Sequence, residues 1–234
     1  MEAQPQQTGF VIWITGMNAS GKSALATLLA RRIALSGRPV ELIDADEDDN
    51  PLTRSLGGER DERDAAVRRI GYAAKLVARA GGIAVVAALS PYREPRETLR
   101  REIRRYVEVF TDCAIETLQK RDAIYRKALA GEVKNVPGID APYEPPTHPD
   151  LVVHTDRETL EDAAKKLFQA LVDVKYLSPA DFGRITGGER PKRARPAARR
   201  AEKRGANARA KLKVAPKATR KPAKKPTAAR AKRR

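Results

Sequence analysis

The sequence has few of the residues that form disulfides and metal centres: its 234 residues include one cysteine and two histidines. A single cysteine excludes both an intramolecular disulfide and a cysteine-based zinc site. Cys113 lies within the apolar run VEVFTDCAI, and this position predicts a buried, unreactive thiol.

Long apolar runs are also absent. The longest are far shorter than the ~20 residues that a membrane-spanning helix needs. The first ten residues, MEAQPQQTGF, lack the basic and apolar regions of a secretory signal. We therefore expect a soluble, cytoplasmic protein.

Acidic residues become scarce only near the carboxyl end, so the formal charge of +17 is unevenly distributed. Residues 187–234 hold 20 basic and two acidic residues, whereas residues 1–186 hold 27 and 28. A segment of Lys, Arg, Ala and Pro cannot bury enough apolar surface to offset the entropy lost on ordering. We predict a flexible N-terminus at 1–8, one folded domain at 9–186 and a disordered basic tail at 187–234.

The charge of the tail predicts non-specific binding to nucleic acid or another polyanion, driven by the release of counterions. The tail contains no aromatic residue, so we expect no recognition of bases. An anionic membrane surface, ribosomal RNA, an acidic protein partner and a purely solubilising role are the alternatives.

In the predicted domain, short apolar runs alternate with longer segments of 3.6-residue periodicity. This pattern indicates an α/β fold with a mostly parallel sheet and helices on both of its faces. Strands are predicted at 10–14, 40–43, 83–87, 107–110 and 151–154. Helices are predicted at 21–35, 62–80, 94–104, 114–119, 123–130 and 157–174.

The segment GMNASGKS, residues 16–23, matches the phosphate-binding pattern G-x-x-x-x-G-K-[ST] between an apolar strand and a helix. Its backbone N–H groups and the positive end of the helix dipole suit phosphate oxygens. Lys22 should reach the β- and γ-phosphates, and the Ser23 hydroxyl should ligate Mg²⁺. The pattern predicts a three-layer P-loop NTPase or kinase fold that binds ATP and Mg²⁺. The residues expected to bind the nucleotide are Gly16, Asn18, Ala19, Ser20, Gly21, Lys22 and Ser23.

Two further segments follow predicted strands at the carboxyl edge of the sheet, where open α/β folds bind ligands. Asp44 and Asp46 follow the second strand, and a carboxylate there can accept a proton from an attacking hydroxyl or hold a Mg²⁺-bound water. A solvated acidic loop is the alternative, more so for residues 47–49. Ser90 and Pro91 follow the third strand, where a purely structural turn is the alternative.

Taken in order, several segments resemble the adenylylsulfate kinase family over roughly residues 10–174. They are WITGMNASGKS, IDAD, RRIGYAAKL, LSPYR, VEVF and AGEVKNVPGIDAPYEPP. The resemblance implies a P-loop enzyme that uses MgATP to phosphorylate the 3′-hydroxyl of adenosine 5′-phosphosulfate, for sulfate activation. Homodimers are common in this family, so the resemblance also implies a possible dimer.

The resemblance also implies roles for individual residues. Asp46 stands where the family has the carboxylate that contacts the acceptor hydroxyl, and Ser90 matches a serine that some members phosphorylate. Arg63 and Lys134 match positions that contact the sulfonucleotide. We therefore expect catalytic roles for Lys22, Asp46 and Ser90, a metal ligand in Ser23, and acceptor binding by Asp44, Asp46, Arg63, Ser90, Lys134, Gly138 and Ile139.

The acceptor pocket departs from the family pattern at several positions. Asp49 replaces an arginine, and Ala66 replaces an asparagine. Gly58 and Val136 replace the two phenylalanines that sandwich the acceptor adenine in the family. Stacking on a base contributes about 1–3 kcal/mol, so losing two such contacts would weaken adenine binding by roughly one to four powers of ten.

Three functions are compatible with these features. The first is adenylylsulfate kinase activity with a divergent acceptor pocket. The second is a related P-loop kinase acting on another nucleotide-like or small-metabolite hydroxyl acceptor. The third is a nucleic-acid-associated P-loop protein. The ATP-binding motif is intact, which favours a working kinase.

Overall fold

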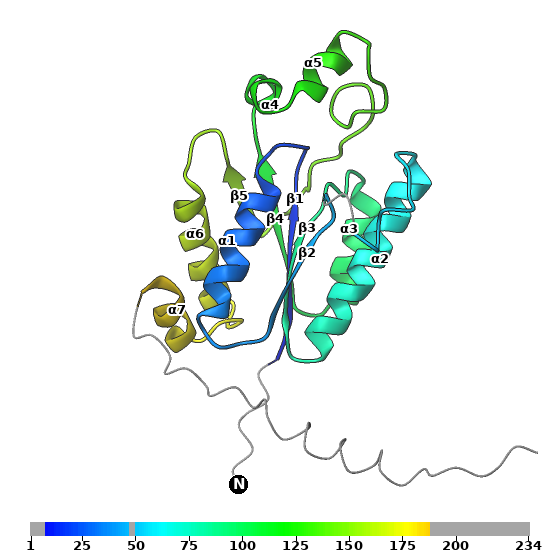
Figure 1. The fold of residues 1–234 in the computed structure, drawn as a ribbon. Helices are drawn as coiled ribbons and strands as arrows, with labels where there is room; N and C mark the ends of the chain where they lie inside the picture. Colours follow the sequence, from blue (N-terminus) through cyan, green and yellow to red (C-terminus); the bar gives the residue numbers. More distant parts are fainter. Residues whose placement is uncertain (1–7, 47–49, 188–234) are drawn as a thin grey trace, which may run out of the picture. The chain divides into compact units, whose positions relative to one another are not determined.

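Five parallel strands form the sheet in the order β2-β3-β1-β4-β5 (Figure 1). They are β1 (Phe10–Thr15), β2 (Val40–Asp44), β3 (Ile83–Ala87), β4 (Tyr106–Asp112) and β5 (Leu151–His154). The predicted α/β fold with its parallel sheet is confirmed, and all five strands were predicted to within two residues at either end.

The computed structural model describes residues 8–46 and 50–187. The predicted flexible N-terminus and basic tail therefore lie almost entirely outside the described residues, as does Asp49, and these expectations stay predictions.

Strands β1 and β3 are buried along their whole length. In β1, FVIWIT, and β3, IAVVA, every residue is buried. These strands lie within the sheet, and a strand covered on both faces requires an uninterrupted apolar run. The continuous apolar runs of the sequence thus correspond to the strands that carry the functional loops.

Seven helices are present in the described part of the chain. They are α1 (Lys22–Ala34), α2 (Arg60–Arg79), α3 (Arg93–Glu102), α4 (Ile115–Arg121), α5 (Ala123–Leu129), α6 (Leu160–Asp173) and α7 (Pro179–Thr186). The first six were predicted. Helix α7 was missed, although Ser178 and Asp181 form a capping box and Pro179 occupies its first turn.

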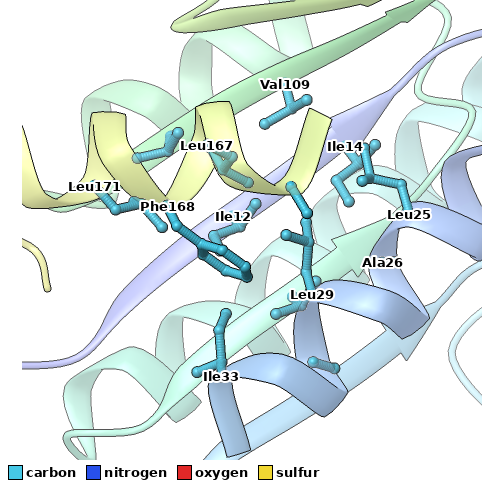
Figure 2. Packing of buried hydrophobic residues seen from close by; sticks show 14 of the residues in the cluster. Ile12, Ile14, Leu25, Ala26, Leu29, Ile33, Val109, Leu167, Phe168 and Leu171 are labelled. Carbon is cyan, nitrogen blue, oxygen red and sulfur yellow. The ribbon is translucent and has the colours of Figure 1, made fainter. Parts of the chain in front are cut away.

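Alternate residues of β1 point to opposite faces of the sheet and contact different helices. Ile12 and Ile14 pack with α1 and α6, where Leu29 and Phe168 belong to the same buried cluster (Figure 2). On the other face, Trp13 packs with α2 and α3 in a second cluster. The sheet is therefore the middle layer of three, as predicted.

Cys113 is buried, as its apolar surroundings predict. It belongs to a small third cluster with residues of α4 and α5. None of the helices in residues 8–46 and 50–187 is long and apolar enough to cross a membrane.

Candidate functional site

The phosphate-binding loop connects β1 to α1 at the carboxyl edge of the sheet (Figure 1). Side-chain and backbone atoms of Thr111 occupy the space that a Cβ atom at Gly16 would need, so only glycine fits there. The Ser20 hydroxyl lies 2.7 Å from the Thr111 hydroxyl, and Tyr125 donates to the Asn18 carbonyl oxygen at 2.7 Å. Strand β4 and helix α5 thereby hold the loop in shape.

Lys22 and Asp46 meet at the end of this loop. The Lys22 side chain is almost fully buried, and its Nζ atom lies 2.9 Å from Asp46 Oδ2. The same Nζ atom donates to the Met17 carbonyl oxygen at 3.1 Å. The Asp46 side chain is 34% exposed. The fold therefore brings the P-loop cation and a carboxylate from the end of β2 into direct contact.

Asp44 shapes the segment that carries Asp46. Its Oδ1 atom accepts a hydrogen bond from the Asp46 backbone N–H at 3.1 Å, and its carbonyl oxygen accepts one from Asn50 Nδ2 at 2.5 Å. The residue is buried. In this structure Asp44 orients the turn after β2.

Ser90 lies in a strained, buried turn after β3. Its backbone has a φ of 35°, which non-glycine residues rarely adopt. Trp13 Nε1 donates to its hydroxyl at 3.1 Å, and the hydroxyl donates to Thr15 Oγ1 at 2.9 Å or to the Ala88 carbonyl at 3.2 Å. Every polar atom of the side chain is thus engaged within the protein.

Replacing Ser90 with alanine is expected to lower the free energy of unfolding by about 1–3 kcal/mol, because the buried Trp13 N–H loses its acceptor. Trp13 is the only tryptophan, so its fluorescence reports this site directly. Urea unfolding followed by fluorescence is the measurement. The exposed Ser55 supplies the matched control, Ser55→Ala. Equal stability of both variants would show that the Ser90 contact contributes nothing.

A pocket of about 240 Å³ opens beside this turn. Asp46, Ser90 and Arg63 all line it, so three of the predicted acceptor residues converge on one cavity. Two of the positions that depart from the family pattern, Gly58 and Ala66, line it as well. Lys134, Gly138 and Ile139 belong to a neighbouring loop and are outside the lining.

That neighbouring loop is tied to the pocket through Arg63. The guanidinium group donates to the carbonyl oxygens of Gly58 at 2.5 Å and Asn135 at 2.8 Å. Asn135 Nδ2 also donates to the Gly58 carbonyl oxygen at 2.9 Å. Arg63 therefore joins the segments on either side of the pocket entrance through their backbones.

The loop 134–141 also contacts the P-loop. The Met17 side chain fills the space that a Cβ atom at Gly138 would need, and Gly138 has a φ of 87°. Ile139 packs against the same cluster as Cys113. Asp140 accepts hydrogen bonds from the backbone N–H groups of Asn135 and Val136, which lower the pKa of its carboxyl.

Sequence reasoning missed several residues that support the site. Arg96 is buried and donates to the carbonyl oxygens of Ser90 and, at 3.1 Å, Tyr92. It also pairs with the buried Glu108 at 3.1 Å. Tyr143 lies 3.1 Å from the Thr15 hydroxyl, and burial raises its pKa to about 12. These contacts fix the Ser90 turn against β1 and β4.

The described residues contain no cluster of three or more His, Cys, Asp or Glu side chains that would hold a metal ion by themselves. Oxygen donors at this edge include the half-buried Ser23 hydroxyl and the Asp44 and Asp46 carboxylates. Such a set suits Mg²⁺, which usually takes few protein ligands together with phosphate oxygens.

Comparison with known proteins identifies the family. A family model described as "Adenylylsulphate kinase" matches residues 8–154. The chain belongs to the adenylylsulfate kinase family. This confirms the resemblance seen in the sequence, and the matched span includes Lys22, Asp46, Arg63 and Ser90.

Relatives in the adenylylsulfate kinase family match most of the described residues. The adenylyl-sulfate kinase of Rippkaea orientalis is 40% identical over 175 residues, covering 74% of this chain and 97% of that protein. A probable bifunctional SAT/APS kinase 2 of Sorangium cellulosum is 45% identical over 172 residues. The match covers 73% of this chain but only 30% of that longer protein.

A solved structure of the family supports the same fold. The Mycobacterium tuberculosis APS kinase CysC, in complex with AMPPNP and APS, has a TM-score of 0.65 and 32% sequence identity. The match covers 70% of this chain and 98% of that one. The predicted three-layer P-loop kinase fold is therefore confirmed for the domain.

Proposed function

We propose that this protein transfers the γ-phosphoryl group of ATP to the 3′-hydroxyl of adenosine 5′-phosphosulfate. The observation that carries the proposal is the 2.9 Å contact between Lys22, at the start of α1, and Asp46, which lines the neighbouring pocket. One end of the site thus suits a nucleoside triphosphate, and the other suits an acceptor. Family membership and the relative in complex with AMPPNP and APS support this choice of substrates.

On the donor side, the loop 16–21 and the first turn of α1 offer backbone N–H groups to the phosphates. Lys22 lies at the base of this loop and supplies the charge that stabilises the transferred phosphoryl group. Ser23 would hold Mg²⁺ together with phosphate oxygens of the nucleotide. When bound, this ion neutralises charge on the phosphate oxygens.

On the acceptor side, Asp46 is the candidate general base. Its carboxylate accepts the proton of the acceptor hydroxyl as the hydroxyl oxygen forms a bond to the γ-phosphorus. The bond between the γ-phosphorus and the bridging oxygen breaks, and ADP leaves. Asp46 is partly exposed and lines the pocket, so its carboxylate can reach an acceptor hydroxyl there.

Ser90 and Arg63 have positioning roles in this proposal. Ser90 is buried and bonded to Trp13 and Thr15, so its turn forms a fixed wall of the pocket. Arg63 joins the segments around Gly58 and Asn135. Lys134 is exposed beside Asn135, where its charge favours an anionic acceptor.

Gly58 lines the acceptor pocket at the position where the family has a phenylalanine that stacks on adenine. This chain therefore has no aromatic side chain at that position. Gly58→Phe is expected to lower KM for adenosine 5′-phosphosulfate by about 5- to 150-fold, given about 1–3 kcal/mol for stacking on a base. A Cβ atom here lies 3.3 Å from Arg63 Nη2 and 3.4 Å from Asn135 Nδ2, so these hydrogen-bonded side-chain ends must move by a few tenths of an ångström. Steady-state kinetics with varied acceptor measures the effect.

The control for this substitution is Gly183→Phe on α7, where an added Cβ atom meets open space. Its kinetics should equal those of the original chain. If Gly58→Phe raises KM or abolishes turnover while the control is unaffected, the pocket wall at Gly58 is not an adenine platform. A different hydroxyl acceptor would then be favoured.

The basic tail supports a second function, non-specific binding of nucleic acid. Its 20 basic residues against two acidic residues are the observation that favours it. Truncation after residue 187 is expected to leave kinase turnover unchanged within about twofold and to abolish retention on DNA or RNA at low salt. Retention by the truncated chain, or loss of turnover, would contradict this division of functions.

The predicted homodimer and cytoplasmic location stay predictions.

A further inference from the structure

A second cavity, of about 590 Å³, lies at the opposite edge of the sheet from the P-loop. Arg38 precedes β2 and Arg105 precedes β4, so both stand where parallel strands begin. Lys175 and Tyr176 follow α6, and Asp181 lies in the first turn of α7. No residue of this cavity belongs to the candidate active site described above.

The lining of this cavity carries an excess of positive charge. Three cations, Arg38, Arg105 and Lys175, face a single carboxylate, Asp181. That carboxylate is already engaged: it accepts hydrogen bonds from the Ser178 N–H at 3.2 Å and hydroxyl at 2.9 Å. It also lies 3.5 Å from the guanidinium group of Arg184, which belongs to the last turn of α7. The positive charges at the cavity are therefore undercompensated.

The two arginines have hydrogen-bond donors to spare. Arg38 is 7% exposed, and its terminal nitrogens donate to the Tyr176 and Thr8 carbonyl oxygens at 3.0 and 2.9 Å. Arg105 donates to the Lys175 carbonyl oxygen at 3.0 Å and to the Thr8 carbonyl oxygen at 3.4 Å. The Nε atoms of both arginines are buried and have no partner within residues 8–46 and 50–187. A buried N–H group without an acceptor is costly.

The pKa of Arg38 follows the same balance of charges. Burial lowers it most, Asp181 raises it, and the neighbouring Arg105 lowers it further. The two guanidinium groups repel each other, and an anion bound between them would relieve this repulsion.

We propose that this cavity binds a small tetrahedral oxyanion, phosphate or sulfate, free or as the terminal group of a small ester. Guanidinium groups match the oxygens of such anions in charge and geometry. Tyr176 offers little free face to a nucleobase, because the Arg105 guanidinium lies 4.2 Å from its ring centroid and the Phe10 ring lies 5.3 Å away. Recognition is therefore by charge.

The test is isothermal titration of the full chain with inorganic sulfate and, separately, with inorganic phosphate. The P-loop is removed as a competing site in two ways, by saturating AMPPNP and by Lys22→Ala in a parallel titration. We expect one saturable site for at least one anion under both conditions. The anion that binds more tightly shows whether the cavity selects sulfate or phosphate.

Arg105→Gln/Lys175→Gln is expected to weaken this binding by about tenfold or more, since charge-assisted hydrogen bonds are lost. The charge-matched control is Arg31→Gln/Arg79→Gln, at two exposed positions away from the cavity. Thermal unfolding checks the fold. If the first variant does not fold, Lys175→Glu at an exposed position replaces it and should abolish binding.

Absence of saturable binding would overturn the proposal. So would equal weakening by both double variants, because this would assign binding to general charge or to the basic tail. Arg38 and Arg105 would then have a structural role, because their hydrogen bonds connect the residue before β1 to the segment after α6.

Discussion

Lys22→Ala is expected to reduce ATP-dependent turnover by about 10²- to 10³-fold or more, the effect of removing one preorganised donor from a charged transition state. Lys22 is the buried cation at the base of the P-loop, and its ammonium group contacts Asp46 at 2.9 Å. Alanine removes the charge that faces the transferred phosphoryl group. ATP consumption by the purified chain, coupled to detection of the phosphorylated product, measures the loss.

The control variant replaces another lysine that forms an ion pair with a carboxylate but lies away from the site. Lys75 on α2 pairs with Glu102 at 2.9 Å, so Lys75→Ala removes a lysine and an ion pair at the surface. Its turnover should stay within about twofold of the original. Thermal unfolding of both variants checks that the fold persists. Substantial residual activity in Lys22→Ala would refute the role of the P-loop in the reaction.

Asp46→Asn is expected to lower kcat by about 10²- to 10⁴-fold, the range for removing a positioned general base. Asparagine keeps the shape of the side chain but does not accept the proton of the acceptor hydroxyl. ATP affinity should be little changed, because the P-loop is untouched and Lys22 merely loses its carboxylate partner. The measurement is kcat together with the dissociation constant for AMPPNP.

The matched control is Asp173→Asn, at the exposed end of α6, where the carboxylate accepts a hydrogen bond from Gln169 at 2.9 Å. This variant should retain full kcat. If Asp46→Asn is equally active, another group must accept the proton. If instead it loses AMPPNP binding in parallel with kcat, Asp46 acts in nucleotide binding.

The strands and the sheet were predictable because they depend on local patterns. Short apolar runs rich in β-branched residues, such as FVIWIT and IAVVA, favour strands that are buried on both faces of a sheet. Helix boundaries depend on caps that the periodicity does not show. Helix α2 begins at Arg60, two residues early, because Glu59 and Glu62 form a capping box. Helix α7 was missed because its start is marked by the capping box of Ser178 and Asp181 and by Pro179, and not by periodicity.

The site was predictable in part, for a similar reason. The P-loop is a contiguous motif, so the sequence predicts Lys22 and Ser23 residue by residue. Asp46 and Ser90 follow different strands, and the parallel sheet places them at one edge. Their roles stay predictions until the variants are measured.

The supporting contacts depend on tertiary packing and leave no mark in the local sequence. Arg96 lies in the highly charged helix REPRETLRRE, which suggests solvent exposure, yet it is buried beneath the Ser90 turn. Tyr143 reaches Thr15 from 128 residues away. Lys134 and Ile139 lie on the loop beside the cavity, and their predicted contact with the acceptor stays a prediction.

The most direct test of the proposed function is phosphoryl transfer itself. The purified chain is incubated with MgATP and adenosine 5′-phosphosulfate, and the 3′-phosphorylated product is separated and quantified. We predict saturable formation of this product in equal amount to ADP, at a raised KM for the acceptor because Gly58 provides no aromatic surface. Saturable AMPPNP binding without any 3′-phosphorylated product would contradict the account and assign the donor site to a different hydroxyl acceptor.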